Sequence, residues 1–161
     1  MAPAVGLNHV SVVARDLEES VRFYRDVLGL ERLPTPNFEF PVAWLRAGDL
    51  QLHLFERPGA APSHAHFGLE IDDFMAAYRR VKELGLLDDT FGSPVYELPD
   101  GAVQMYVRDP TGNLIELDFP DASEIPKDEV PEYVRLSDRR PQEGEAARAR
   151  LFLTRHALAR T

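Results

Sequence analysis

The chain contains one pattern twice, and this internal repeat of about 57 residues restricts the folds open to it. The first copy starts at His9 and reads HVSVVARDLEESVRFYRDVLGL, and the second starts at His66 and reads HFGLEIDDFMAAYRRVKELGL. Each copy predicts a short apolar strand, an acidic helix start, an amphipathic helix and a closing Leu-Gly-Leu. Two such units can pack so that the leading histidines come from related strands and face one cleft.

Length and composition exclude several classes of protein. A chain of 161 residues can form one well-buried core or two small fused modules. Cysteine is absent, which excludes disulfide scaffolds, thiolate metal sites and cysteine nucleophiles, and fits a cytoplasmic location. The formal charge of −9 argues against nucleic-acid binding, because it would repel a phosphate backbone. No apolar run approaches the ~20 residues of a membrane span, and no secretory signal is visible, so we expect no membrane partner.

The first module, residues 5–57, is expected to read strand, helix and three further strands. A β-branched run predicts the opening strand over residues 6–14. Asp16 can cap the following helix, in which apolar residues recur at helical spacing over residues 17–28. Strands are then expected near residues 30–34, 40–47 and 50–57.

The second module, residues 65–120, repeats this order after a linker rich in Pro, Gly and Ala. Its strand runs from about His66 to Ile71, and Asp72 or Asp73 caps a helix that ends near Gly85. Strands follow near residues 93–98, 102–108 and 113–119. Residues 121–161 form a C-terminal extension, expected to be extended over its proline-rich first part and partly helical after residue 143.

Three separated segments carry a resemblance to a known family. LNHVSVVARDLEESVRFYRDVLGL, HFGLEIDD and DPTGNLIEL resemble, in this order, the vicinal oxygen chelate superfamily of glyoxalase I, methylmalonyl-CoA epimerase, extradiol dioxygenases and fosfomycin- and bleomycin-resistance proteins. The likeness covers roughly residues 5–120. It implies an α+β fold of paired βαβββ modules, whose sheets curve into an open barrel around a metal cleft, and it implies a homodimer.

The same resemblance implies a metal site. It assigns His9 and His66, which open the two modules, and Glu116, which follows the DPTGN turn, as ligands. Imidazoles and a carboxylate suit Fe, Mn, Ni, Co or Zn as divalent ions and leave coordination positions open for a substrate.

A fourth ligand is expected on the last strand of the first module, LQLHLFE. The alignment with the family favours Gln51, and His53 lies on the same face because strand side chains repeat every second residue. Counting from the glycine turns points instead to Leu52, and Glu56 is expected at the rim of the cleft. If neither Gln51 nor His53 ligates, two histidines and a carboxylate form a facial triad.

Three further residues are candidates for the substrate pocket or the chemistry. Tyr106 precedes Glu116 by ten residues, a spacing that resembles the extradiol dioxygenase tyrosine. Arg108 could clamp an anionic substrate group or pair with a surface carboxylate. Trp44 is either core or a wall of the cleft.

These observations lead to three hypotheses for the function. The first is a metal-dependent lyase or isomerase of glyoxalase type, in which a small substrate binds the metal through two oxygens and Glu116 moves a proton. The second is an extradiol dioxygenase that cleaves a catechol with Tyr106 positioning the diol. The third is a metal-free protein that binds a drug or metabolite, as in the bleomycin-resistance branch. The sequence lacks GxGxxG, P-loop, GxSxG and HExxH motifs, which disfavours nicotinamide chemistry, phosphoryl transfer and serine hydrolysis.

Overall fold

The computed structural model describes residues 4–154, which divide into two compact units. Unit one comprises residues 1–63 and 109–113, and unit two comprises residues 64–108 and 114–161. The short segment Asp109–Asn113 connects two strands of unit two, yet its contacts assign it to unit one.

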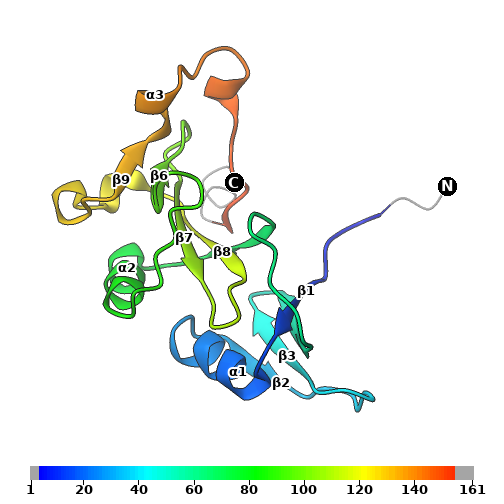
Figure 1. Ribbon diagram of the computed structural model, residues 1–161. Helices are drawn as coiled ribbons and strands as arrows, with labels where there is room; N and C mark the ends of the chain where they lie inside the picture. The colour runs from blue at the N-terminus through cyan, green and yellow to red at the C-terminus, as the bar shows by residue number, and fades with distance from the viewer. Residues whose placement is uncertain (1–3, 155–161) are drawn as a thin grey trace. The chain divides into compact units, whose positions relative to one another are not determined.

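Unit one has the βαβββ order that the sequence predicted. Its elements are β1 (His9–Ala14), α1 (Leu17–Asp26), β2 (Glu31–Leu33), β3 (Val42–Ala47) and β4 (Leu50–Glu56). The strands form one sheet in the order β1-β4-β3-β2, with β1 parallel to β4 and the other neighbours antiparallel. In Figure 1 this unit runs from the blue β1 and α1 to the cyan β2 and β3.

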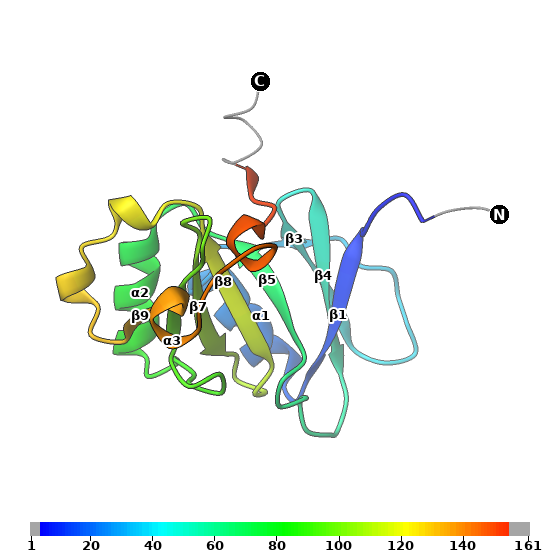
Figure 2. The same ribbon diagram turned by 90° about the horizontal axis from the view of Figure 1, so that it is seen from above.

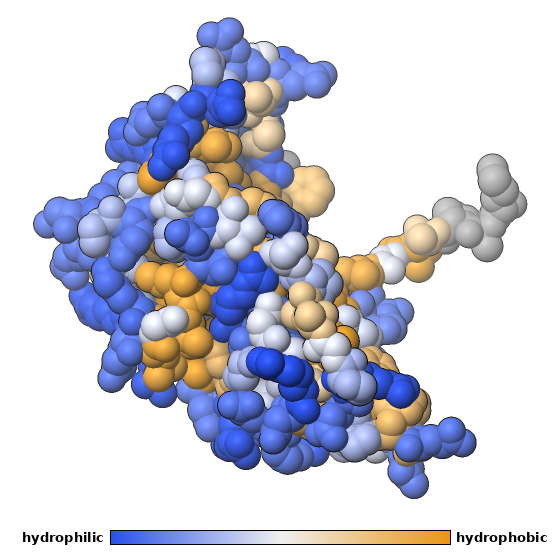
Figure 3. All heavy atoms as spheres, in the orientation of Figure 1, coloured by the Kyte–Doolittle hydropathy of each residue, from blue (hydrophilic) through white to orange (hydrophobic). Residues whose placement is uncertain are grey.

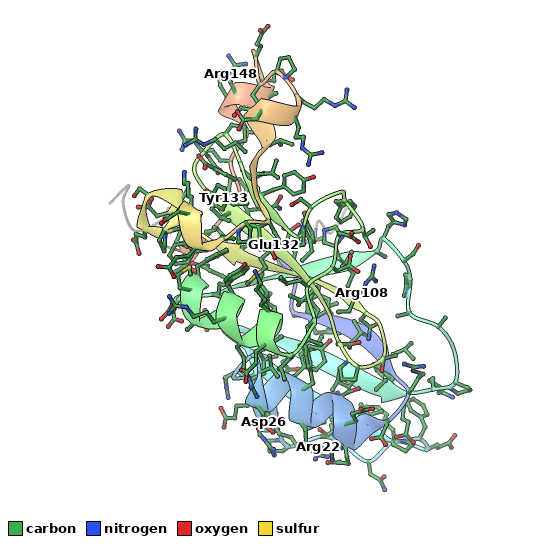
Figure 4. All side chains as sticks on the ribbon, turned by 60° about the vertical axis from the view of Figure 1, so that its left-hand side comes forward. Arg22, Asp26, Arg108, Glu132, Tyr133 and Arg148 are labelled. Carbon is green, nitrogen blue, oxygen red and sulfur yellow. The ribbon has the colours of Figure 1, made fainter. Side chains whose placement is uncertain are left out.

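Helix α1 begins and ends at residues that suit those positions. The Asp16 carboxylate accepts a hydrogen bond of 2.8 Å from the backbone N–H of Glu19, which satisfies a donor that the first helical turn leaves free. Gly29 has a φ of 72°, a left-handed conformation that glycine adopts without strain, and it stops the helix. The buried face of α1 packs on the sheet, whereas Arg22 and Asp26 project to solvent (Figure 4).

Unit two repeats the order and adds one strand. Its elements are β5 (His66–Glu70), α2 (Phe74–Glu83), β6 (Val95–Glu97), β7 (Val103–Arg108), β8 (Leu114–Phe119) and β9 (Tyr133–Arg135). The sheet order is β5-β8-β7-β6-β9, and Figure 2 shows β5, β8 and β7 side by side. The second βαβββ module is therefore confirmed, but β9, which pairs in parallel with β6, was not predicted.

The C-terminal extension has only short helices in its described part. These are 3-10 turns at Ala122–Glu124, Lys127–Glu129 and Ala146–Arg148, and the four-residue helix α3 (Leu136–Arg139). The good helix formers after residue 143 give no longer helix up to residue 154, and Leu153 is buried while Phe152 is 96% exposed. Residues 155–161, with His156, lie outside the described residues.

Each sheet has one apolar face, which packs against the helix of its own unit. In unit one, the alternate residues Leu52 and Leu54 of β4 and Leu45 of β3 are at most 1% exposed. In unit two, the alternate residues Ile115, Leu117 and Phe119 of β8 are at most 3% exposed, and the Phe119 ring lies 6.0 Å from that of Phe74 in α2. The opposite face of each sheet carries the polar and aromatic residues from which the candidate site is built.

Hydrophilic side chains cover most of the surface in the view of Figure 3, with apolar patches between them. Among residues 4–154 no helix has the length and apolar character needed to cross a membrane.

The segment before β9 is tied to unit two by charged hydrogen bonds. Glu132 accepts a hydrogen bond from the Tyr78 hydroxyl of α2 at 2.5 Å, and the neighbouring Tyr133 donates to Glu97 of β6 at 2.6 Å (Figure 4). Lys127 also donates to the Glu97 carboxylate, at 2.8 Å. Burial alone would raise the pKa of Glu97, but the hydrogen bonds from Lys127 and Tyr133 outweigh it and lower that pKa.

The Glu97 carboxylate makes the stability of the extension depend on pH. Its lowered folded-state pKa means that its contribution is present above the unfolded pKa of about 4.3 and is lost as pH falls through the folded value. We predict that Glu97→Gln lowers the free energy of unfolding at pH 7 by roughly 1–2 kcal/mol. The free energies of unfolding of the two proteins, measured with urea, should begin to converge below about pH 4.3 and become equal only once the pH is below the folded-state pKa of Glu97. A difference that stays constant down to acid pH would contradict this assignment.

Asp109 is the buried anchor of the segment that joins β7 to β8. Its Oδ1 accepts hydrogen bonds of 2.8–2.9 Å from the backbone N–H groups of Thr111, Gly112 and Asn113. Its Oδ2 accepts hydrogen bonds from the hydroxyl of Tyr24 at 2.8 Å and from the side-chain amide of Asn113 at 2.7 Å. The carboxylate is 4% exposed, so these five donors replace its water.

We predict that Asp109→Ala lowers the free energy of unfolding by about 3–5 kcal/mol, because it leaves several buried donors without an acceptor. Tyr24→Phe is the matched control, since it removes one donor and leaves the carboxylate otherwise satisfied, and it should cost about 1–2 kcal/mol. Equilibrium denaturation measures both values. Equal losses for the two variants would show that Asp109 is not the anchor.

Candidate functional site

The open face of unit one carries two of the predicted ligands. In the parallel pairing of β1 with β4, His9 lies opposite Gln51 and Ser11 lies opposite His53. In the antiparallel pairing of β3 with β4, Trp44 lies opposite His53. Residues opposite each other point to the same side of a sheet. The sheet therefore presents His9, Gln51, His53 and Trp44 on one face.

His53 lies in the middle of a stack of three rings. Its ring is 4.4 Å from that of His9 and 4.5 Å from that of Trp44, with interplanar angles of 15° and 7°. Burial lowers the pKa of His53, and the nearby His9 lowers it further. Both effects favour the neutral imidazole, which is the form that binds metals. The Oε1 atom of Gln51 lies 2.8 Å from Nε2 of His53, so Gln51 holds this ring by a hydrogen bond.

Two other expectations for β4 are wrong. Leu52 is 1% exposed on the face that packs against α1, so it cannot share a site with His9. Glu56 does not lie at the rim of the site-bearing face either. Its carboxylate accepts a hydrogen bond of 2.9 Å from the backbone N–H of Leu17 and so caps the start of α1.

The open face of unit two brings together His66, Glu116 and Tyr106. The pairing of β5 with β8 sets Gly68 opposite Glu116, and the pairing of β7 with β8 sets Tyr106 opposite Glu116. Nε2 of His66 is 3.4 Å from Oε2 of Glu116. Nδ1 of His66 lies 2.9 Å from the carbonyl oxygen of His64. An Nδ1–H that donates to this carbonyl leaves the Nε2 lone pair directed at Glu116, which is the usual tautomer of a metal-binding histidine.

Asp118 belongs to the same face and was missed by the sequence analysis. It follows Glu116 by two residues in β8, is 4% exposed, and its Oδ1 has no hydrogen-bond partner among residues 4–154. Burial and the neighbouring Glu116 raise the pKa of Asp118 to about 8. The two-residue spacing on a strand was the available signal.

Gly68 leaves space for the Asp118 carboxyl group. A Cβ atom at this position would lie 2.7 Å from Oδ2 of Asp118 and 3.9 Å from Oε1 of Glu116. Any larger residue at position 68 would therefore push into the pair of carboxyl groups.

Tyr106 and Arg108 follow each other at alternate positions of β7. Tyr106 is 6% exposed, its ring meets that of His66 edge to face at 5.9 Å, and burial together with a hydrogen bond to Glu116 raises the pKa of its hydroxyl. Arg108 donates to Asp88 and Thr90, each at 2.8 Å. Burial alone would raise the pKa of Asp88, but hydrogen bonds from Arg108 and Thr90 outweigh it and lower that pKa. The Arg108 guanidinium, which was predicted to clamp a substrate, is therefore paired with the Asp88 carboxylate.

The registers of the two units are equivalent. His53 lies opposite the residue that follows His9 by two, and Glu116 lies opposite the residue that follows His66 by two. Each unit therefore offers one pair of side chains of the kind that binds divalent transition metals, and these donor types fit such an ion. Within residues 4–154 no group of three or more His, Cys, Asp or Glu side chains lies close enough together to hold a metal ion.

Two βαβββ units with strand-borne imidazoles define an α+β protein of paired modules. The family model described as Glyoxalase/Bleomycin resistance protein/Dioxygenase superfamily matches residues 6–117. The chain therefore belongs to this superfamily, as its motifs predicted.

Individual relatives have different names within the family. The chain is 29% identical to Glyoxylase I 4 of Arabidopsis thaliana over 121 residues, which cover 69% of this chain and 68% of the relative. It is 30% identical to a bleomycin resistance protein of Klebsiella pneumoniae over 112 residues, 65% of this chain and 84% of the relative. A solved structure, lactoylglutathione lyase from Agrobacterium tumefaciens, matches with a TM-score of 0.56 and 25% identity, covering 73% of this chain and 95% of that one.

We predict that Gly68→Ala destabilises the protein by about 1–3 kcal/mol, because its methyl group meets the buried Asp118 carboxyl. Gly6→Ala is the matched control, since nothing lies within 4 Å of a Cβ atom there, and its effect should stay within about 0.5 kcal/mol. Adding Asp118→Ala to Gly68→Ala should cost less than the sum of the two single changes. Strict additivity in thermal or urea unfolding would refute the proposed contact.

Proposed function

We propose that this protein is a divalent-metal-dependent enzyme that acts on a small substrate with two neighbouring oxygens, by glyoxalase-like lyase or isomerase chemistry. The observation that carries the proposal is the equal register of His9 with His53 and of His66 with Glu116. The names of the relatives, a glyoxylase and a lactoylglutathione lyase, agree with this type of chemistry.

His9, His53, His66 and Glu116 would hold the ion, which is Fe, Mn, Ni, Co or Zn. This assignment prefers His53 to Gln51, because His53 is the position of unit one that corresponds by register to Glu116. Gln51 then acts as a positioning residue, since it is hydrogen bonded to the His53 ring. A divalent ion held by these residues would polarise a substrate oxygen.

The residues around Glu116 suit proton transfer. Its Oε2 faces Nε2 of His66 at 3.4 Å, and it is 7% exposed, so bulk water has little access to it. The Tyr106 hydroxyl donates to Oε1 of Gln104 at 3.4 Å, and Glu116 is near enough to help raise the pKa of that hydroxyl. In the proposed reaction Glu116 takes a proton from one substrate carbon and returns it to the adjacent one.

A second candidate is extradiol cleavage of a catechol. Tyr106 favours it, because this tyrosine lies edge to face with His66 at 5.9 Å and opposite Glu116 in the pairing of β7 with β8. Oxygen uptake on addition of catechol to the Fe-loaded protein separates this reaction from a lyase or isomerase. The third hypothesis, a metal-free binding protein, predicts no metal uptake at all.

Two broader features also belong to the proposal. We expect the chain to pair as a homodimer, since the resemblance implies it, and analytical ultracentrifugation measures this directly. We expect it to act in the cytoplasm, a location that the absence of cysteine fits.

We predict that His53→Ala lowers metal affinity by more than about 100-fold, whereas Gln51→Ala lowers it by about 10-fold or less. Metal analysis of dialysed protein and calorimetric titration with Zn, Ni and Mn measure both values, and circular dichroism checks that each variant is folded. The reverse order would assign Gln51 as the ligand. Unchanged affinity in both variants would remove unit one from the metal site.

A further inference from the structure

Unit one carries a cluster of aromatic side chains that the proposed metal site does not use. We call Phe38, Phe40, Trp44 and Phe55 the aromatic row. Successive ring centroids lie 6.0 Å apart for Phe38 and Phe40, 6.3 Å for Phe38 and Trp44, and 5.8 Å for Phe40 and Phe55. Such distances are typical of interacting aromatic rings.

The aromatic row continues directly from the histidines. Trp44 stacks on His53, and Phe55 follows His53 by two residues on β4 with its ring 6.5 Å away. At the other end of the same face, the pairing of the strands places His9 opposite Gln51 and Gln51 opposite Arg46. This face therefore has a polar end and an aromatic end, with His53 between them.

The aromatic row is not needed for the core of unit one. The core lies on the other face of the sheet, where Leu45, Leu52 and Leu54 are at most 1% exposed. Phe38 by contrast remains 41% exposed, and it lies with Phe40 on the connection between β2 and β3. Phe40, Trp44 and Phe55 are half-buried. A contiguous group of partly exposed aromatic rings beside polar ligands marks a binding surface rather than a fold requirement.

The sequence of the connection between β2 and β3 also reduces the conformational entropy that binding would cost. Residues 34–41 read PTPNFEFP, and three prolines restrict the backbone, so little conformational entropy is lost when a ligand binds. Arg57 lies over the Phe40 ring at 3.9 Å and holds it in place by a cation–π contact.

Trp44 provides a second and independent sign of a missing partner. Its Nε1 atom is buried and has no hydrogen-bond acceptor among residues 4–154. Leaving such a donor unsatisfied costs about 1–3 kcal/mol. A ligand with an acceptor oxygen next to an aromatic ring can remove this cost after a small shift of the side chains.

We infer that the substrate carries a planar aromatic group, attached directly to the carbons that bear its two oxygens, and that this group stacks on the aromatic row. The inference rests on the proposed function for the position of the oxygens. Side chains two residues apart on a strand are about 6.6–6.8 Å apart. Phe55 therefore lies about one ring diameter beyond the donor atoms of His53. A long linker between ring and oxygens would therefore carry the ring past Phe55.

The test compares ligands that share their oxygens and differ in the ring. Mandelate, its cyclohexyl analogue hexahydromandelate and lactate each have a hydroxyl next to a carboxylate. Trp44 is the only tryptophan of the chain, so its fluorescence reports on the aromatic row directly, and calorimetry gives an independent dissociation constant. We expect the metal-loaded protein to bind mandelate about 10-fold more tightly than lactate, with hexahydromandelate weaker than mandelate.

Phe38→Ala is the informative variant, because Phe38 belongs to the aromatic row but to none of the proposed ligands. It should weaken mandelate binding by about 5- to 10-fold and leave lactate binding and metal content unchanged. Phe152→Ala is the matched control. It removes a phenyl ring that is 96% exposed in unit two and should change none of these values.

The outcomes separate this inference from the proposed function. Equal binding of mandelate and lactate by metal-loaded protein overturns the aromatic substrate and leaves the metal site intact. A preference for mandelate that persists unchanged in EDTA supports the aromatic row and argues against the metal. Absence of binding by any of the three up to about 10 mM, far above an ordinary enzyme–ligand dissociation constant, overturns the inference.

Discussion

The buried carboxylate of Asp109 is the interaction on which the rest of the structure most depends. It lies between β7 and β8, and five hydrogen-bond donors surround it in place of water. Three of those donors are consecutive backbone N–H groups, so one carboxylate sets the path of the chain just before β8 begins. The first residue of β8 is Leu114, and Glu116 follows two positions later. The Asp109 carboxylate, which has a structural role, therefore fixes the direction of the Glu116 carboxylate, which is the proposed catalytic group.

Sequence alone predicted both modules because their signals are local. Asp16 and Asp73 cap their helices as expected, and both glycines that close the repeats have a positive φ. The strand β9 could not be predicted, since it has three residues and no turn signal beside it. Its pairing with β6 is accompanied by hydrogen bonds from Lys127 and Tyr133 to Glu97. Its existence depends on tertiary contacts, not on propensity.

The sequence alone predicts which face of the sheet carries the candidate site. It does not predict which residue on that face is the metal ligand. In LQLHLFE the alternation correctly separates Leu52, which is stabilised by burial, from Gln51 and His53, which share the other face. The alternation of strand side chains cannot distinguish Gln51 from His53, because both residues lie on the same face of the sheet. Only the pairing of β4 with β1, compared with that of β8 with β5, identifies His53 as the counterpart of Glu116. Asp118 was overlooked since two carboxylates on one buried face repel each other unless one holds a proton.

The unsatisfied polar atoms give this site its clearest physical signature. Among residues 4–154, two buried side-chain atoms lack a hydrogen-bond partner, Nε1 of Trp44 and Oδ1 of Asp118. One is a donor in unit one and the other an acceptor in unit two, and each lies on the site-bearing face of its sheet. The helix-facing cores contain no such atom within the same residues. A folded chain tolerates an unfavourable group of about 1–3 kcal/mol where another molecule supplies the missing partner, so the two atoms support the proposal that these faces bind a ligand.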